Sequence, residues 1–145
     1  MSLAPHFWTV APRLRHAVRP LLCPETTPFA FTVPDPVLGP VQLTGKLRAA
    51  ADSDELLVVI HGLGGCADSH YMPRAALAAE AAGLSCLRLN LRGSDRLGED
   101  IYHAALTADL HAALALPALA AYRRIYLLGY SVGGHVVLRY ATEAG

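Results

Sequence analysis

From residue 51 onward, strand-like apolar runs alternate with helix-like runs, and this alternation constrains the fold more than any other feature. Residues 56–60 form a continuous apolar run rich in β-branched side chains, as expected of a strand covered on both faces of a sheet. Residues 84–89 and 125–130 predict two further strands. Strands that alternate with helices are joined by right-handed crossovers and lie parallel. The pattern therefore predicts a parallel α/β sheet.

Helices are predicted between and after these strands. The first begins at Pro73, a residue type favoured at the first helical position, and stops at Gly83. The second covers residues 103–116, where leucines recur every four residues and Pro117 follows. The third covers residues 132–143, with an apolar stripe along one side.

The N-terminal part of the chain has a different character, because residues 1–40 hold eight of the ten prolines. Proline fixes φ and removes a backbone donor, so we expect an irregular arm with short extended pieces rather than a helix. Residues 29–33 and 41–47 alternate apolar and polar side chains and predict an antiparallel hairpin. We therefore divide the chain into an arm containing proline and arginine, residues 1–27, and a partial α/β domain, residues 28–145.

Composition and charge argue against several functional classes. Twelve Lys and Arg residues balance twelve Asp and Glu residues, so no overall charge attracts nucleic acid. No apolar run reaches the roughly 18 residues of a transmembrane helix, and the N-terminus lacks the apolar core of a secretory signal. The three cysteines show no C-x-x-C spacing, which argues against a disulfide framework and a zinc site. We expect a cytoplasmic protein without a transmembrane segment, a nucleic-acid partner or a metal.

A G-x-S-x-G motif at residues 129–133 is the clearest functional signal. It lies between a predicted strand and a predicted helix, as the nucleophile elbow of a hydrolase requires. Gly129 and Gly133 lack a Cβ, so strand and helix can approach closely around a strained serine. The start of the helix directs unpaired N–H groups toward the place where an oxyanion forms. We therefore predict Ser131 as the nucleophile and the Val132 N–H as one oxyanion donor.

The loop His61-Gly62-Leu63-Gly64-Gly65 follows the strand at residues 56–60. A glycine-rich loop can turn an amide outward, so we predict the Leu63 N–H as the second oxyanion donor. Gly62 supports this loop, and we expect His61 to hold it through hydrogen bonds to the backbone. Residues 62–67 also match the dinucleotide fingerprint G-x-G-x-x-A. The late helix start and the lack of an acid after the next strand make a dinucleotide-binding domain a remote alternative.

These motifs together resemble the α/β-hydrolase fold superfamily, in its YheT-like branch. The resemblance includes residues 89–94 and 102–105 and extends over nearly the whole chain. It implies the N-terminal half of an α/β-hydrolase sheet, an antiparallel hairpin followed by parallel strands with crossover helices. It also implies a serine hydrolase that cleaves small or lipid-like esters through an acyl-enzyme and a Ser-His-Asp triad, without a cofactor.

The acid and the histidine of such a triad are not assigned in this sequence. In this fold both follow the nucleophile, but only fourteen residues follow Ser131 and the predicted helix takes them up. We expect His135 to pack along that helix and Asp109 to play a structural role in the middle of its own. A serine without a base is a weak nucleophile, so we expect the chain to be catalytically incomplete.

The alternative from another functional class is a non-catalytic α/β module. In the strand order of the family, residues 125–130 form an interior strand. If no further strand pairs with it, its backbone groups are open to another chain. We then expect a homo-oligomer or swapped dimer through this edge.

Overall fold

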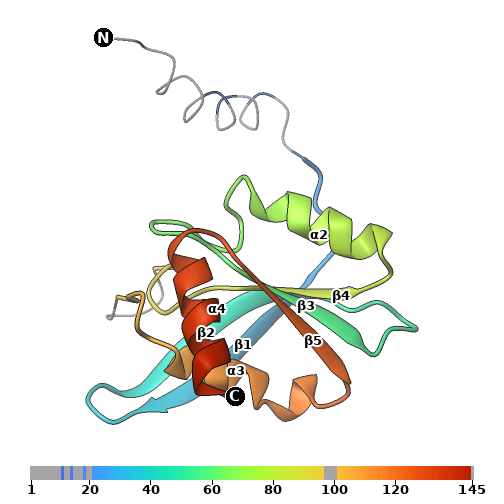
Figure 1. Ribbon diagram of the computed structural model, residues 1–145. Helices are drawn as coiled ribbons and strands as arrows, with labels where there is room; N and C mark the ends of the chain where they lie inside the picture. The colour runs from blue at the N-terminus through green and yellow to red at the C-terminus, as the bar shows by residue number, and fades with distance from the viewer. Residues whose placement is uncertain (1–10, 12–13, 15–17, 19–20, 97–100, 145) are drawn as a thin grey trace.

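The computed structural model describes residues 11, 14, 18, 21–96 and 101–144 (Figure 1). These residues contain one five-stranded mixed sheet in the order β1-β2-β4-β3-β5. The α/β class predicted from the sequence is confirmed.

An antiparallel hairpin forms one side of the sheet. Strand β1 (Thr27–Asp35) pairs with β2 (Gly39–Arg48), from Thr27 opposite Leu47 to Asp35 opposite Gly39. The Asp35 carboxylate closes the turn by accepting the Val37 and Leu38 N–H groups at 2.9 and 3.1 Å. The predicted hairpin is therefore present, with strands longer than the sequence indicated.

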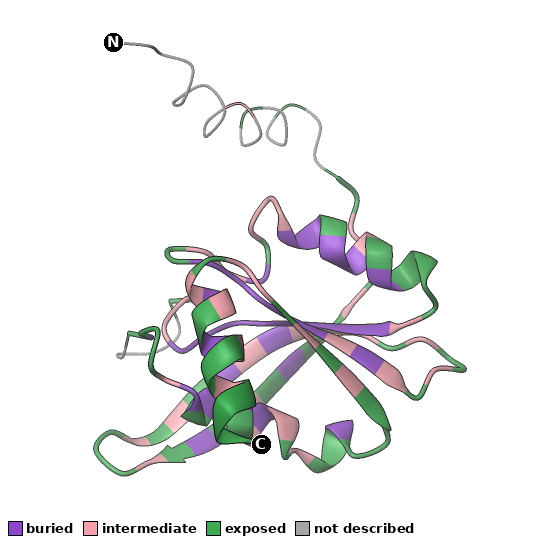
Figure 2. Ribbon diagram, in the orientation of Figure 1, coloured by how far each residue is buried: buried purple, intermediate pink, exposed green. Residues whose placement is uncertain are grey.

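Three parallel strands form the rest of the sheet. Strand β3 (Glu55–Ile60) lies between β4 (Ser85–Leu89) and β5 (Arg124–Gly129) and is parallel to both. All residues of β4 are buried (Figure 2). The predicted strands at 56–60 and 84–89 are thus core strands.

Helices cover both faces of the sheet (Figure 1). Helix α2 (Met72–Ala81) packs on β3 and β4 on one face. Helices α3 (Ala108–Leu114) and α4 (Val132–Glu143) contribute to the larger core on the other face, where Leu110 and Val136 are fully buried. None of the helices in the described part of the chain is long and apolar enough to span a membrane.

Two sequence predictions about helices were wrong. The helix expected over 103–116 is confined to α3, because the Ala105 and Leu106 N–H groups bond to His103 in a separate turn. Leu116 is extended, as a residue before proline prefers, and a short 3₁₀ helix, η1 (Pro117–Leu119), follows it. In the arm, residues 11, 14 and 18 are helical where we expected no helix, and the rest of residues 1–20 lies outside the described part.

Strand β5 is less covered than the sequence suggested. On the face that α2 shares, Tyr126 and Leu128 are 44% and 37% exposed. Helix α2 packs on β3 and β4, and within the described residues β5 pairs with β3 alone. Strand β5 is therefore an edge strand of this sheet.

Candidate active site

Ser131 occupies a sharp turn between β5 and α4. Its backbone has φ 52° and ψ −116°, a region that residues with a side chain rarely adopt. A Cβ on Gly129 would overlap the carbonyl group of Gly133, and a Cβ on Gly133 would lie 2.5 Å from the His61 oxygen. Both glycines are therefore sterically required at this turn.

The start of α4 presents a free donor beside Ser131. The Gly133 N–H bonds to the Tyr130 oxygen and the Gly134 N–H to the Ser131 oxygen, each at 2.9 Å. Within the described residues the Val132 N–H has no hydrogen-bond partner. A helix start leaves such groups open and adds the positive end of its dipole.

The loop after β3 has one free N–H as well. Every N–H of residues 62–67 except that of Leu63 finds an acceptor within the described chain. The acceptors are Tyr71 Oη for Gly62 (2.9 Å), Tyr102 Oη for Gly64 (2.6 Å), the Gly62 oxygen for Gly65 (3.0 Å), Ser69 Oγ for Cys66 (2.9 Å) and Asn90 Oδ1 for Ala67 (2.6 Å). Leu63 is left as a donor, and its side chain is 79% exposed.

The two free donors belong to neighbouring segments. A Cβ on Gly62 would lie 3.3 Å from Ser131 Cβ and 3.3 Å from the Tyr130 oxygen. The loop after β3 therefore runs directly past the turn that holds Ser131. Free backbone N–H groups close to a serine are the kind of donor that an oxyanion hole requires.

His61 is buried beneath the loop. Its Nδ1–H donates to the Gly62 oxygen at 2.8 Å, and its Nε2 faces the Leu91 N–H and the Ser94 hydroxyl, each at 3.1 Å. Burial lowers the pKa of His61 below its ordinary value, so the ring stays neutral. Its nitrogens are thus engaged in holding two loops together.

No histidine or carboxylate in the described chain is hydrogen-bonded to the Ser131 hydroxyl. His135 is exposed on α4, contrary to the packing that we expected. His111 lies 3.3 Å from Glu143 on the surface. Asp109 lies in the first turn of α3, not mid-helix, and pairs with Arg92. The described part of the chain therefore brings the Ser131 turn and two free N–H groups close together, with no histidine or carboxylate bonded to the serine hydroxyl.

Some groups at the site were not predicted from the sequence. Tyr71 carries no local signal, since its contact with Gly62 is made only in the folded chain. Ser94 lies in the segment 89–94 that resembles the family pattern, but its contact with His61 crosses 33 positions. Tyr102 lies in a segment that resembles the family pattern, but its hydrogen bond to Gly64 crosses 38 positions.

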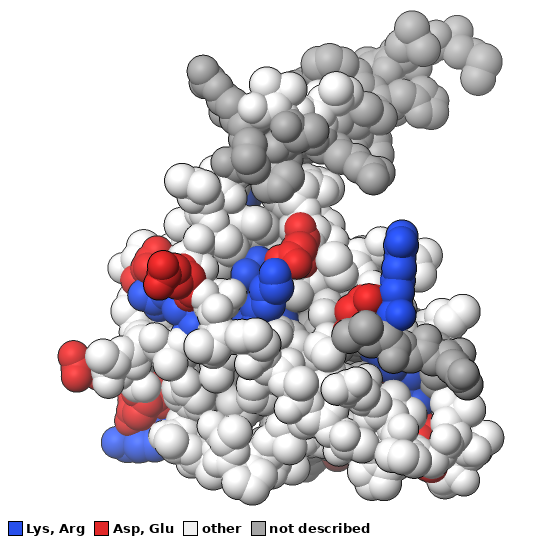
Figure 3. All heavy atoms as spheres, turned by 180° about the vertical axis from the view of Figure 1, so that it is seen from behind, with Lys and Arg blue, Asp and Glu red and all other residues white. Residues whose placement is uncertain are grey.

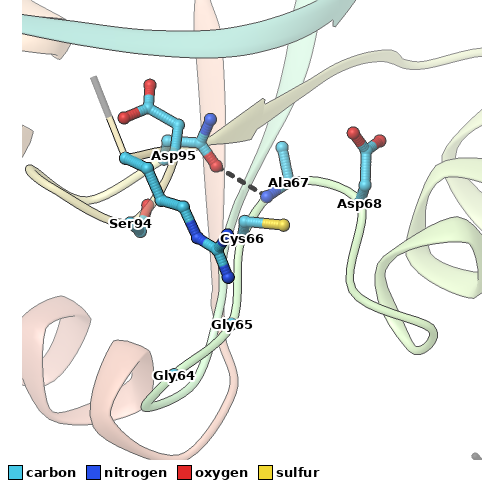
Figure 4. Close-up of a pocket in the computed structure, with 9 residues that line it drawn as sticks. Gly64, Gly65, Cys66, Ala67, Asp68, Ser94 and Asp95 are labelled. Atoms are coloured by element: carbon cyan, nitrogen blue, oxygen red, sulfur yellow. Dashed lines mark hydrogen bonds between the residues drawn. The ribbon is translucent and has the colours of Figure 1, made fainter.

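Two cavities lie beside the loop after β3. One, of about 430 Å³, is polar and is lined by Asp68, Asn90, Ser94 and Asp95 among others (Figure 4). The other, of about 370 Å³, borders Leu63 and is lined largely by apolar groups. Ser131 lines neither cavity.

The charged surface is mixed in sign. Lys46 pairs with Asp68 at 2.7 Å and Arg48 with Glu80 at 3.1 Å. On the face in Figure 3, basic and acidic side chains lie next to one another. In the described residues no group of three or more His, Cys, Asp or Glu side chains is placed to hold a metal ion.

Comparison with known proteins gives a family and a fold. The model of the alpha/beta hydrolase fold family matches residues 55–144. None of the curated proteins matches the chain.

Several solved structures share the fold. The α/β hydrolase GrgF from Penicillium sp. sh18 is 23% identical over 81% of this chain and 42% of its own, with a TM-score of 0.62. The esterase Pf2001 from Pyrococcus furiosus is 21% identical over 79% of this chain and 46% of its own, with a TM-score of 0.67. Est1E from Butyrivibrio proteoclasticus is 21% identical, with the same coverage and a TM-score of 0.57.

The chain thus spans less than half the length of each of these structures. The family match covers β3 to α4, the elements that build the Ser131 turn and the loop after β3. The chain belongs to the α/β-hydrolase fold family.

Proposed function

We propose that this chain is the N-terminal part of a serine hydrolase of the YheT-like branch that cleaves carboxylic esters through Ser131. The observation that carries the proposal is the strained Ser131 turn, with the loop after β3 beside it and a free N–H on each segment. Backbone strain of this kind is typical of functional positions. The close approach of β5, α4 and the loop after β3 is possible because Gly129, Gly133 and Gly62 have no Cβ.

The proposed reaction proceeds in two steps. Ser131 Oγ attacks the acyl carbon while its proton passes to a base, and the Leu63 and Val132 N–H groups bind the resulting oxyanion. The carbon–oxygen bond to the alcohol breaks, the alcohol takes up a proton, and an acyl-Ser131 ester remains. Water then attacks this ester and releases the acid and free Ser131.

The base and its supporting acid are proposed to come from outside these 145 residues. The matched structures are about twice as long, and a serine hydroxyl reacts slowly without a base. We therefore expect this chain alone to hydrolyse esters poorly.

The proposed substrate is a small or lipid-like ester. One of the similar structures is an esterase, and the largely apolar cavity beside Leu63 suits an uncharged group. The proposal requires no cofactor, and a cytoplasmic location remains a prediction.

A fluorophosphonate probe tests the proposal, because it forms a covalent bond only with an activated serine. We expect slow labelling of this chain, faster labelling of a form extended through the downstream reading frame, and attachment at Ser131 by peptide mass spectrometry. Ser131→Ala abolishes the labelling. Ser53→Ala, at the opposite end of β3, is the matched control and leaves it unchanged. Absence of labelling in both forms contradicts the proposal.

The exposed edge of β5 favours a second candidate, a non-catalytic module that pairs with another copy. Tyr126 and Leu128 are exposed on a strand whose second edge has no partner in the described part of the chain. Unpaired strand edges of this kind recruit other strands. Light scattering after size-exclusion chromatography should then show a dimer that Leu128→Lys dissociates, with Ser131 unreactive. A monomer at high concentration excludes this candidate.

A further inference from the structure

The Gly62–Leu63 peptide group carries the predicted oxyanion donor, and its carbonyl is held by several donors. The Gly62 oxygen accepts the His61 Nδ1–H at 2.8 Å, the Gly65 N–H at 3.0 Å and the Tyr102 hydroxyl at 3.4 Å. In a planar trans peptide the C=O and N–H bonds point in opposite directions. Because the Gly62 oxygen is held by His61, Gly65 and Tyr102, the Leu63 N–H of the same peptide group points away from these donors.

Two tyrosine hydroxyls hold the residues on either side of that N–H. Tyr71 Oη accepts the Gly62 N–H at 2.9 Å, and Tyr102 Oη accepts the Gly64 N–H at 2.6 Å. Tyr71 immediately precedes α2, whereas Tyr102 lies in the segment between β4 and α3. The loop is thus fixed from two separate parts of the fold.

The rings of both tyrosines have packing partners of their own. The Tyr102 ring meets the His61 ring edge-on at 5.3 Å, and the Tyr71 ring lies 4.7 Å from that of Tyr130. These contacts remain when tyrosine is replaced by phenylalanine. The hydroxyl contribution is therefore separable from packing.

Tyr71 also lies close to the nucleophile. The point that a Cβ on Gly62 would occupy is 3.3 Å from Ser131 Cβ and 3.4 Å from Tyr71 Oη. The Tyr71 hydroxyl and Ser131 therefore lie on the same side of Gly62, and the hydrogen bond to Tyr71 acts where the loop passes close to the Ser131 turn. Small displacements at such a place change the alignment of a donor with an oxyanion.

We propose that Tyr71 and Tyr102 are positioning residues, whose hydroxyls orient the Gly62–Leu63 peptide so that the Leu63 N–H is the free donor beside Ser131. The catalytic consequence rests on the proposed serine hydrolase function. The orientation of the loop does not depend on that function.

Amide hydrogen exchange, followed residue by residue by NMR, tests the loop-holding role on the chain as it exists. Tyr71→Phe should accelerate exchange at Gly62, and Tyr102→Phe at Gly64, each by about tenfold, as expected for one hydrogen bond. Leu63 should exchange rapidly in every form. Tyr126→Phe, an exposed tyrosine on β5, is the matched control and should leave all three amides unchanged. Unaltered exchange at Gly62 and Gly64 overturns the proposal.

The fluorophosphonate labelling rate at Ser131 then tests positioning, with the thermal unfolding midpoint of each variant as a check on folding. We expect labelling about tenfold slower in Tyr71→Phe and Tyr102→Phe, if one hydrogen bond sets the alignment, and unchanged in Tyr126→Phe. Faster exchange with unchanged labelling overturns the positioning role. If neither the unaltered chain nor its extended form labels while exchange responds as expected, the loop-holding role stands and the serine hydrolase function fails.

Discussion

Replacing Asp109 by alanine removes one partner of a buried ion pair. The Arg92 guanidinium contacts the Asp109 carboxylate at 2.9 Å through Nε and at 2.5 Å through Nη2, and the side chains are 3% and 1% exposed. Breaking such a pair costs about 3–5 kcal/mol, because the Arg92 charge stays buried and keeps its bond to the Asp35 carboxylate at 2.8 Å but loses its bonds to both oxygens of Asp109. A single domain has a stability of about 5–15 kcal/mol, so a large share should be lost.

Urea unfolding followed by circular dichroism measures this loss as a change in the free energy of unfolding. Asp54→Ala is the matched control, since the Asp54–Arg123 pair is largely exposed and should contribute only about 0–1 kcal/mol. A cost below about 1 kcal/mol for Asp109→Ala would refute the buried-charge reasoning based on this pair. The double variant Arg92→Met with Asp109→Leu should recover part of the loss, because apolar side chains can replace a buried pair.

Three further predictions concern the Ser131 turn and the histidine beneath the neighbouring loop. Ser131→Gly should raise the free energy of unfolding by about 1 kcal/mol, because glycine adopts the positive φ of this turn without strain. Equal stability of Ser131→Gly and Ser131→Ala in urea would argue against backbone strain at residue 131. Gly133→Ala should lower it by about 1–3 kcal/mol, because the added Cβ meets the His61 oxygen at 2.5 Å; an unchanged urea midpoint would be inconsistent with that contact. Burial lowers the pKa of His61 in the folded chain. As the pH falls below about 6.5, the unfolded chain therefore binds more protons than the folded chain does. The contribution of the buried neutral ring to the free energy of unfolding should be complete above this pH and decline below it. Urea midpoints at several pH values should show this decline, and His61→Asn should weaken it.

The order of elements and the Ser131 turn were predictable from sequence because they depend on local patterns. Apolar periodicity located the hairpin and the parallel strands, and α4 (Val132–Glu143) has the predicted limits. The spacing of Gly129, Ser131 and Gly133 specifies the turn, because the steric requirement acts within a few residues. The roles of Ser131 and its donors remain proposals.

Other features were decided only by the tertiary structure. The buried Arg92–Asp109 pair joins residues 17 positions apart, and the hydrogen bond from Gly64 to Tyr102 joins residues 38 apart. The turn at residues 103–106 and the exposure of β5 likewise depend on what packs beside them. Periodicity shows which side chains share a face. Which loops meet at the carboxyl edge of the sheet, and which N–H they leave free, is set by contacts between distant segments.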